Sequence, residues 1–270
     1  MKVNYHFHSR CSFDAEHPLT ELCAVAQKAG LRYLCLTDHC DLVDEFGVDD
    51  DTWDWAAIDR ELSEARARYP DLEICRGVEL GEALMRPEPA KKVLSEPGID
   101  FVLGSMHHTV RREDFYHLRY TDAGKCERIL EEYLYCLLAM SRTDDLDSLA
   151  HLTYPMRYIR YRDGVKVDIR RFDDLIREIL KNLAERGKAL ELNTSGYRQG
   201  MGGPMPDEYI LKMYRELGGE LITIGTDAHV PEHMASDLDR GEALLEACGF
   251  RYVTLYRNRK PIQMRLEDVK

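Results

Sequence analysis

Two hydrophobic periods alternate along almost the whole chain. Short apolar runs of strand length occur at 2–7, 33–37, 73–80, 101–105, 148–152, 189–193 and 222–226. Segments with apolar residues at helical spacing separate them, at 19–29, 56–68, 87–95, 124–141, 171–186, 207–217 and 237–248. A further strand-like stretch covers 252–256. Repeated strand–helix units predict an α/β fold with a parallel sheet, which is either closed into a barrel or open and doubly wound.

The chain has 270 residues without an evident linker or repeat, so we expect one domain spanning 1–270. It carries 37 Lys and Arg against 49 Asp and Glu, a formal net charge of −12. Because nucleic-acid affinity rests on clustered Lys and Arg, this balance argues against a polymeric nucleic acid as partner. No apolar run approaches the roughly 18 residues of a membrane-spanning helix, and the first residues lack the apolar core of a signal peptide. We therefore expect a soluble, cytoplasmic protein.

Metal-capable or polar side chains follow each predicted strand at its carboxyl end. They are His6, His8, Asp38, His39, Glu79, His107, His108, His151, Asn193, Asp227 and His229. The i, i+2 spacing of His6 and His8 puts both side chains on one face of a strand, where they can share a metal. In a parallel barrel the carboxyl ends of the strands converge on one face, which is where active sites are built. The joint placement of these residues predicts a metal centre at the mouth of a barrel.

The types of ligand restrict the metal. Imidazoles and carboxylates without thiolates suit zinc, manganese or iron. The eight cysteines include no C-x-x-C pair, which argues against a cysteine zinc site and against a disulfide framework. About nine candidate ligands exceed the needs of one tetrahedral ion, so we expect two or three divalent metals with a carboxylate such as Glu79 bridging. Such clusters lower the pKa of bound water and clamp phosphoryl oxygens during in-line displacement.

Short motifs give the chain a resemblance to a known family. They are H-x-H-S at 6–9, T-D-H at 37–39, G-V-E at 77–79, S-M-H-H at 105–108, H-L at 151–152 and G-T-D-A-H at 225–229. In this order they resemble the polymerase-and-histidinol-phosphatase (PHP) superfamily of metal-dependent phosphoesterases, over essentially the full chain. Residues 191–196 are similar to the E-x-N-T-S-G motif of its stand-alone histidinol-phosphate phosphatase branch. The resemblance implies a distorted (β/α)7 barrel.

The resemblance implies three metal sites when the family pattern is carried over position by position. The implied ligands are His6, His8, Glu79 and Asp227 for the first metal, Glu79, His107 and His151 for the second, and Asp14, His39 and His229 for the third. Glu16 and His17 are alternatives for the early acidic ligand of the third site. A hydroxide shared by the first two metals would attack phosphorus. Glu79, Asp227 and His39 are accordingly the expected catalytic residues.

The resemblance also implies a substrate, the small phosphomonoester L-histidinol phosphate, hydrolysed to L-histidinol and phosphate in histidine biosynthesis. Arg198, after 189–193, and Arg160, in the loop after 148–152, are expected to bind its phosphate, since a guanidinium fork suits phosphate oxygens. Asn193 is expected to contact substrate. The acidic loop 40–55 is either a solvated loop or a lid that recognises the cationic amine and imidazole of L-histidinol.

Two other functions stay open at this point. A PHP-family phosphoesterase acting on nucleotides, short oligonucleotides or phosphotyrosine would use the same metal centre. A non-catalytic metal-binding PHP module is the alternative from a different class, against which the nearly complete set of ligands argues. A phosphate-release assay separates all three.

Overall fold

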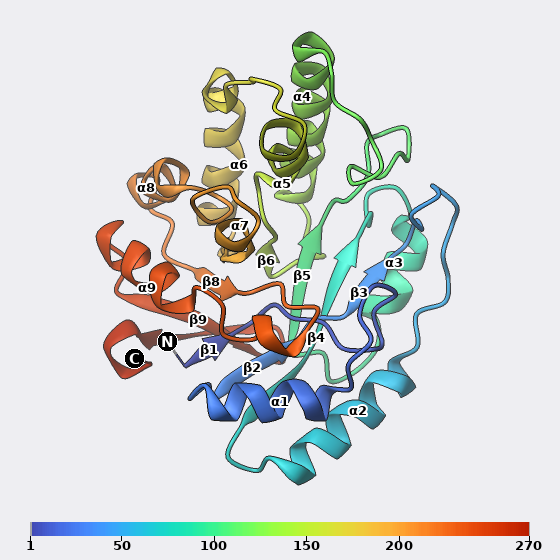
Figure 1. Cartoon of the computed structure of the whole chain (residues 1–270), viewed down its shortest axis with the longest axis vertical. Helices are drawn as coiled ribbons and strands as arrows, with labels where there is room; N and C mark the ends of the chain where they lie inside the picture. Colours follow the sequence, from blue (N-terminus) through green and yellow to red (C-terminus); the bar gives the residue numbers. More distant parts are fainter. Residues whose placement is uncertain (1, 270) are drawn as a thin grey trace.

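The computed structural model describes residues 2–269 and confirms the predicted alternation of strands and helices (Figure 1). The strands are β1 (Val3–Asn4), β2 (Tyr33–Leu36), β3 (His39–Asp41), β4 (Glu73–Gly81), β5 (Phe101–Ser105), β6 (Ser148–Leu149), β7 (Ala189–Asn193), β8 (Ile222–Gly225), β9 (Tyr252–Arg257) and β10 (Lys260–Arg265). The α-helices are α1 (Leu19–Lys28), α2 (Trp55–Arg68), α3 (Pro87–Leu94), α4 (Ala123–Met140), α5 (Tyr154–Met156), α6 (Asp173–Glu185), α7 (Ser195–Arg198), α8 (Glu208–Glu216) and α9 (Leu238–Ala247).

One parallel sheet forms the centre of the molecule. Its strands lie in the order β1-β2-β4-β5-β6-β7-β8, and β3 pairs with β4 beyond the end of β2. The two edges meet, because the N–H of Tyr5 donates to the carbonyl of Ile224 (2.9 Å) and the N–H of Asp227 donates to the carbonyl of His6 (2.8 Å). The sheet is therefore a nearly closed parallel barrel, which confirms the (β/α)7 barrel and excludes the open, doubly wound sheet.

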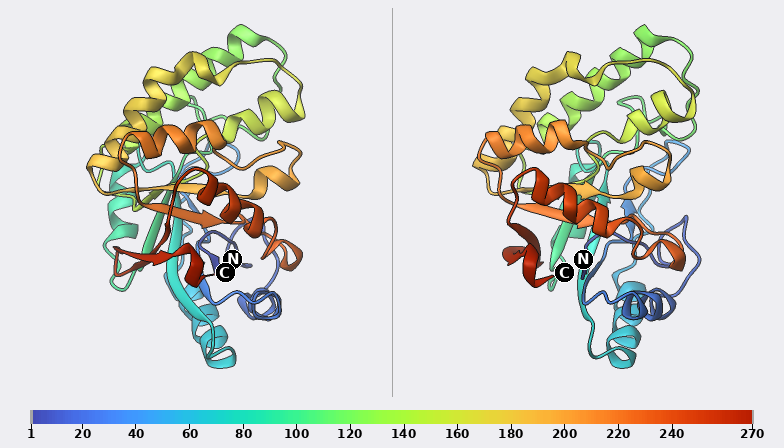
Figure 2. Two further views of the ribbon diagram at one scale, coloured as in Figure 1. Left: turned by 90° about the vertical axis from the view of Figure 1, so that its left-hand side faces the viewer. Right: turned by 60° about the vertical axis from the view of Figure 1, so that its left-hand side comes forward.

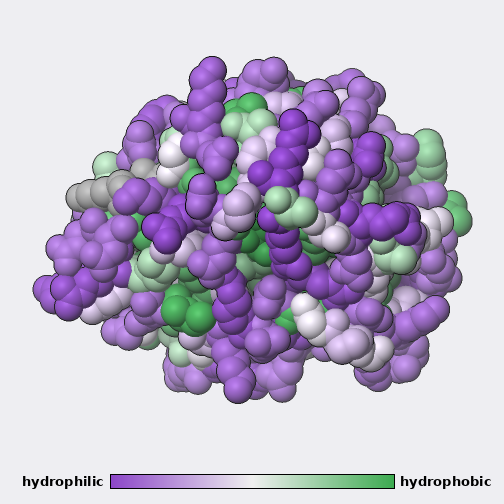
Figure 3. All heavy atoms as spheres, turned by 90° about the horizontal axis from the view of Figure 1, so that it is seen from below, coloured by the Kyte–Doolittle hydropathy of each residue, from purple (hydrophilic) through white to green (hydrophobic). Residues whose placement is uncertain are grey.

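The helices surround the strands in Figure 1, and the longer ones, such as α1, α4 and α6, bury an apolar face. In α6 the buried residues are Ile176, Ile179, Leu180 and Leu183, which follow the i, i+3, i+4, i+7 spacing of one helix face. Polar residues take the outer faces. Figure 3 accordingly shows a face covered mostly by hydrophilic residues, with hydrophobic ones in small, scattered groups.

The observed strands are shorter than predicted where they approach the mouth of the barrel. The run 148–152 is extended only over Ser148–Leu149, because His151 adopts a positive φ of 20°, which a strand does not accommodate. The run 2–7 is a strand only over Val3–Asn4, after which Phe7 makes an isolated bridge to Ala228. After these interruptions, the side chains that follow β1 and β6, among them His6 and His151, point into the mouth of the barrel.

Other differences concern short segments and the ends of elements, and they include β3 and α7, which were not predicted. The predicted loop after β6 is helical, with α5 continuing into a π-helical turn at Arg157–Arg162. Helix α6 begins at Asp173 rather than 171, after a 3-10 turn at Ile169–Phe172. Strand β10 was not predicted, because its side chains are almost all exposed in an antiparallel hairpin with β9 and show no apolar face.

The two ends of the described chain lie side by side (Figures 1 and 2). The N–H of Lys2, just before β1, donates to the carbonyl of Val269 at 2.6 Å. This contact lies at the amino ends of the strands, at the opposite end of the barrel from their carboxyl ends. Within residues 2–269, no helix combines the length and the apolar character that crossing a membrane requires.

Candidate metal centre

Glu79 lies at the middle of the predicted cluster, on β4, with a fully buried side chain. Its Oε2 is 3.0 Å from Nε2 of His6. Its Oε1 is 3.0 Å from Nε2 of His151 and 3.2 Å from Nε2 of His107. The two carboxylate oxygens thus face imidazoles on opposite sides, as expected for a bridging ligand.

His8 and Asp227 join His6 on the Oε2 side of Glu79. The Nε2 atoms of His6 and His8 are 3.0 Å apart. Oδ1 of Asp227 is 3.5 Å from Nε2 of His6 and 3.4 Å from Nε2 of His8. Asp227 has a positive φ of 55° and is held by the hydrogen bond from its N–H to His6. The closing edges of the barrel therefore bring these four residues together.

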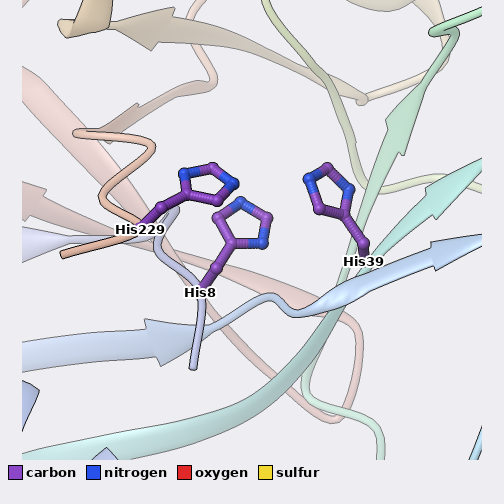
Figure 4. Close-up of side chains that lie close together, drawn as sticks. All are labelled: His8, His39 and His229. Atoms are coloured by element: carbon purple, nitrogen blue, oxygen red, sulfur yellow. The ribbon is translucent and has the colours of Figure 1, made fainter. Parts of the chain in front are cut away.

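A further group of imidazoles lies beside the first (Figure 4). The ring centroid of His8 lies 4.2 Å from that of His39 and 4.1 Å from that of His229, and the last two are 5.7 Å apart. Oδ2 of Asp14 lies 3.0 Å from Nε2 of His229 and 3.8 Å from Nε2 of His39. The structure thus places an early acidic residue between the two outer histidines.

The alternatives to Asp14 lie elsewhere. Nδ1 of His17 is 2.9 Å from Oε2 of Glu21, one helical turn further along, and Glu16 is exposed. Of the three candidates, Asp14 is the one that the structure brings to His39 and His229.

The sequence neighbours of the cluster have other partners. His108 follows His107 directly, but its Nδ1 lies 3.1 Å from Oε1 of Glu82 and its Nε2 donates to the carbonyl of Asp44. Asp38 precedes His39 and accepts hydrogen bonds from the N–H of Ser9 (2.5 Å) and its hydroxyl (2.8 Å). Burial raises the pKa of Asp38 to about 6.

The electrostatics of the cluster favour a bound cation. Burial alone would raise the pKa of Glu79, but the imidazoles of His6, His39 and His107 bring it well below its usual range. Burial, with the neighbouring rings of His229 and His39, lowers the pKa of His8 to about 3. An ionised carboxylate and a neutral imidazole are the forms that ligate metals.

The imidazoles that face several carboxylates respond in the opposite direction. Burial by itself lowers the pKa of His39, yet the carboxylates of Asp41, Glu79 and Asp14 raise it to about 10. The pKa of His6 is likewise raised well above its usual value, against the effect of burial, by Glu191 and Glu79. The cluster therefore concentrates negative charge that positive charge must balance.

The donor set also fits metal ions geometrically. Two adjacent ligands about 2.0–2.1 Å from one zinc ion lie about 2.8–3.4 Å apart in octahedral or tetrahedral coordination. The Nε2 atoms of His6 and His8 are 3.0 Å apart, and Nε2 of His8 is 3.5 Å from Glu79. Nδ1 of His39 and Nε2 of His229 are buried yet make no hydrogen bond of normal geometry. These atoms converge as ligands do around an ion.

The three predicted substrate-binding residues differ in burial and in their contacts with this cluster. Asn193 is fully buried, and its Nδ2 lies 3.4 Å from Oδ2 of Asp227. Arg198 is half-buried and donates to the carbonyls of Thr226 (2.5 Å) and Asp227 (2.6 Å). Arg160 is exposed on the π-helical turn. Their contact with a substrate stays a prediction.

The acidic loop 40–55 borders a cleft of about 1410 Å³ that also reaches His39 and Phe13. Part of its charge is balanced by Arg86, which lies 3.3 Å from Asp49 and 3.0 Å from Asp51. These ion pairs hold the loop against α3, beside the metal-capable cluster. Both interpretations of the loop, solvated segment or lid, therefore stay predictions.

The sequence analysis did not identify the residues that contact the Nδ1 atoms of the clustered histidines. Oδ2 of Asp41 is 3.0 Å from Nδ1 of His107, and the hydroxyl of Ser12 is 3.1 Å from Nδ1 of His8. Glu191 contacts His6 in a similar way. The available signal was the strand period, since Asp41 stands two residues after His39 and Glu191 two before Asn193, each on the same face of its strand.

Comparisons with known proteins agree with this fold. A family model described as PHP domain matches residues 4–195. The chain is 29% identical over 263 residues to a probable histidinol-phosphatase of Thermotoga maritima, covering 94% of this chain and 95% of that protein. It is 28% identical over 269 residues to a histidinol-phosphatase of Lactococcus lactis, covering 96% of each.

A solved structure is similar over nearly the whole fold. It is the crystal structure of histidinol phosphate phosphatase from Lactococcus lactis complexed with zinc, L-histidinol and phosphate. The two structures superimpose with a TM-score of 0.79 at 26% identity, covering 97% of this chain and 98% of that one. Since the family model matches well over half of the chain and the barrel agrees with it, the chain belongs to the PHP domain family.

Proposed function

We propose that this chain is a metal-dependent phosphomonoesterase that hydrolyses L-histidinol phosphate to L-histidinol and phosphate. The observation that carries the proposal is the buried cluster of imidazoles and carboxylates on both sides of Glu79. The similar protein of known structure holds zinc, L-histidinol and phosphate together. The cleft beside His39 gives a small organic phosphate access to the cluster.

The proposed cofactors are two to three divalent metals, zinc, manganese or iron, which suit nitrogen and oxygen ligands. Their ligands would be His6, His8, Glu79 and Asp227 for the first, Glu79, His107 and His151 for the second, and Asp14, His39 and His229 for the third. When bound, such metals supply a nucleophile at neutral pH and neutralise charge on phosphoryl oxygens.

The chain's own residues then have distinct roles in this proposal. Glu79 holds the two inner groups of imidazoles at a fixed separation through its two oxygens. Asp227 completes the first group, at the closing edge of the barrel. His39 lies where the cluster meets the cleft, and we assign it a role beside the leaving alcohol.

A phosphate-release panel with purified, metal-replete protein tests the proposed substrate. We expect L-histidinol phosphate to have a higher kcat/KM than nucleoside monophosphates, a dinucleotide or phosphotyrosine. A preference for one of the other three would move the chain to a different PHP activity. Release from none of them would favour the non-catalytic metal-binding module.

Removing the guanidinium of Arg198 or Arg160 is expected to lower kcat/KM by roughly 10–150-fold, from the loss of about 1.5–3 kcal/mol of charge-assisted hydrogen bonding. Arg198 uses two N–H groups on backbone carbonyls, and a guanidinium has five. Arg198→Ala and Arg160→Ala should both weaken inhibition by inorganic phosphate without changing metal content.

The matched control is Arg170→Ala, which removes an exposed guanidinium packed on Tyr209, outside the cluster. It should leave both kinetic constants unchanged. Unaltered kcat/KM and phosphate inhibition in the two test variants would mean that other groups bind the phosphate. A loss of metal from Arg198→Ala would instead assign that arginine to holding Asp227.

A further inference from the structure

We propose that Glu191 is a positioning residue that orients His6 and His151 at the same time and so couples the two inner metal sites. The inference rests on the proposed metal centre, to which it adds a residue outside the set of ligands. Glu191 lies on β7, at the mouth of the barrel, and its side chain is buried, with 1% exposed.

Each oxygen of Glu191 has a different partner. Oε1 lies 2.5 Å from Nδ1 of His6. Oε2 accepts a hydrogen bond of 2.7 Å from the backbone N–H of His151. His6 and His151 face opposite oxygens of Glu79 through their Nε2 atoms. One buried carboxylate therefore contacts a residue on either side of the bridging ligand.

The contact with His6 determines which ring nitrogen can bind a metal. A carboxylate accepts but does not donate, so Nδ1 of His6 must carry the proton of this hydrogen bond. Nε2, which lies 3.0 Å from Oε2 of Glu79 and from Nε2 of His8, is then the nitrogen left to bind a metal. Such carboxylate–histidine pairs orient metal ligands and fix their tautomer.

The contact with His151 acts on the backbone. His151 has a φ of 20°, a conformation that is unfavourable for a residue with a side chain and persists only when its surroundings hold it. The hydrogen bond from its N–H to Glu191 is one such restraint, and it directs the chain out of β6 so that the ring reaches Glu79.

The neighbouring strand leaves space for this pair of contacts. A Cβ at Gly225 would lie 2.2 Å from Cβ of His6 and 3.0 Å from Oε1 of Glu191. Any larger residue at 225 would therefore push His6 and Glu191 apart. This close packing explains why position 225 of the G-T-D-A-H motif is a glycine. The explanation does not depend on Asp227 or His229, the other residues of the motif with a proposed function.

The other inner group shows the same arrangement. Nδ1 of His107 contacts Oδ2 of Asp41 at 3.0 Å, while its Nε2 faces Glu79. Asp41 also lies 3.5 Å from Nδ1 of His39, which faces Oε2 of Glu79, so Asp41 reaches both sides of Glu79 through side chains alone. Glu191 differs in that it joins the ring of His6 to the backbone N–H of His151, a pair that Glu79 connects through their Nε2 atoms.

The experiment compares Glu191→Gln with wild type in metal affinity, measured by competition with a chelator using zinc alone. The amide keeps the size of the side chain but can offer only one acceptor oxygen to two donors. We expect zinc affinity to fall about 10–100-fold at the inner sites, as for comparable residues behind metal ligands. Glu191→Asp, which keeps the charge, should recover part of the loss.

The matched control is Asp147→Asn, another buried carboxylate, which accepts from the N–H of Val102 (2.9 Å) and from Arg259 (2.6 Å) away from the cluster. It should lower thermal stability without altering zinc affinity. Zinc affinity of Glu191→Gln within about threefold of wild type would overturn the proposal, as would an equal loss in Asp147→Asn.

A measurement on the unaltered chain keeps the proposal testable if Glu191→Gln does not fold. Nitrogen-15 NMR of the zinc-loaded protein should show His6 with its proton on Nδ1, its signal assigned by comparison with His6→Gln. A proton on Nε2 would refute the role of Glu191. Phosphate release from L-histidinol phosphate, assayed in parallel, tests the substrate separately and does not bear on these metal affinities.

Discussion

Replacing Glu79 by glutamine is expected to lower kcat for phosphate release by more than about 100-fold, since even residues behind metal ligands often contribute 10–100-fold. Glu79 is fully buried, and both of its oxygens face imidazoles. Glutamine has the same shape, but its amide nitrogen cannot ligate a metal and its charge is zero. A 100-fold loss corresponds to about 2.7 kcal/mol in the activation barrier.

The measurement pairs steady-state kinetics with elemental analysis, and Glu79→Gln should also retain fewer metal ions per chain. Asp147→Asn is the control, because Asp147 is a buried carboxylate that accepts from the N–H of Val102 and from Arg259 and does not line the cleft. The control should keep both kcat and metal content. A kcat for Glu79→Gln within about threefold of wild type would show that Glu79 does not bridge metals.

Removing the metals is expected to reduce phosphate release to background. In the proposed mechanism the metals supply the nucleophile at neutral pH and neutralise charge on the phosphoryl oxygens, and the side chains of the cluster hold the metals. Elemental analysis of the purified protein should give two to three zinc, manganese or iron ions per chain. Activity should return when one of these metals is added back to chelated protein. Full activity of metal-free protein kept under chelator would contradict the proposed mechanism.

The same treatment should lower thermal stability. Glu79, Asp227 and Asp41 are carboxylates in a largely buried cluster, and the imidazoles of His6, His39 and His107 depress the pKa of Glu79 well below its usual range, against the effect of burial. A bound cation stabilises the folded state because ligand binding is linked to folding. Melting curves with and without chelator measure this; an unchanged Tm would mean that metals do not bind the cluster.

The barrel was predictable because its signal is local and repeated. Each strand is a short apolar run, and each intervening helix has an apolar face, as α6 does with Ile176, Ile179, Leu180 and Leu183. Strand β10 lacks such a signal, because an exposed hairpin strand needs no apolar face. The ends of β1 and β6 were also misplaced, since the interruption at His151 depends on a strained backbone that distant contacts maintain.

The sequence by itself determined that the metal-capable residues lie on one face, because the carboxyl ends of parallel strands meet at one end of a barrel. Asp14 was distinguished from His17 by the tertiary structure alone, which also shows His108 turned toward Glu82, because ring direction depends on partners such as Glu21 and Glu82. The position of Glu191 beside His6 was likewise decided by barrel closure. Those residues are 185 positions apart, and no local period links a carboxylate on β7 to a ring beyond β1.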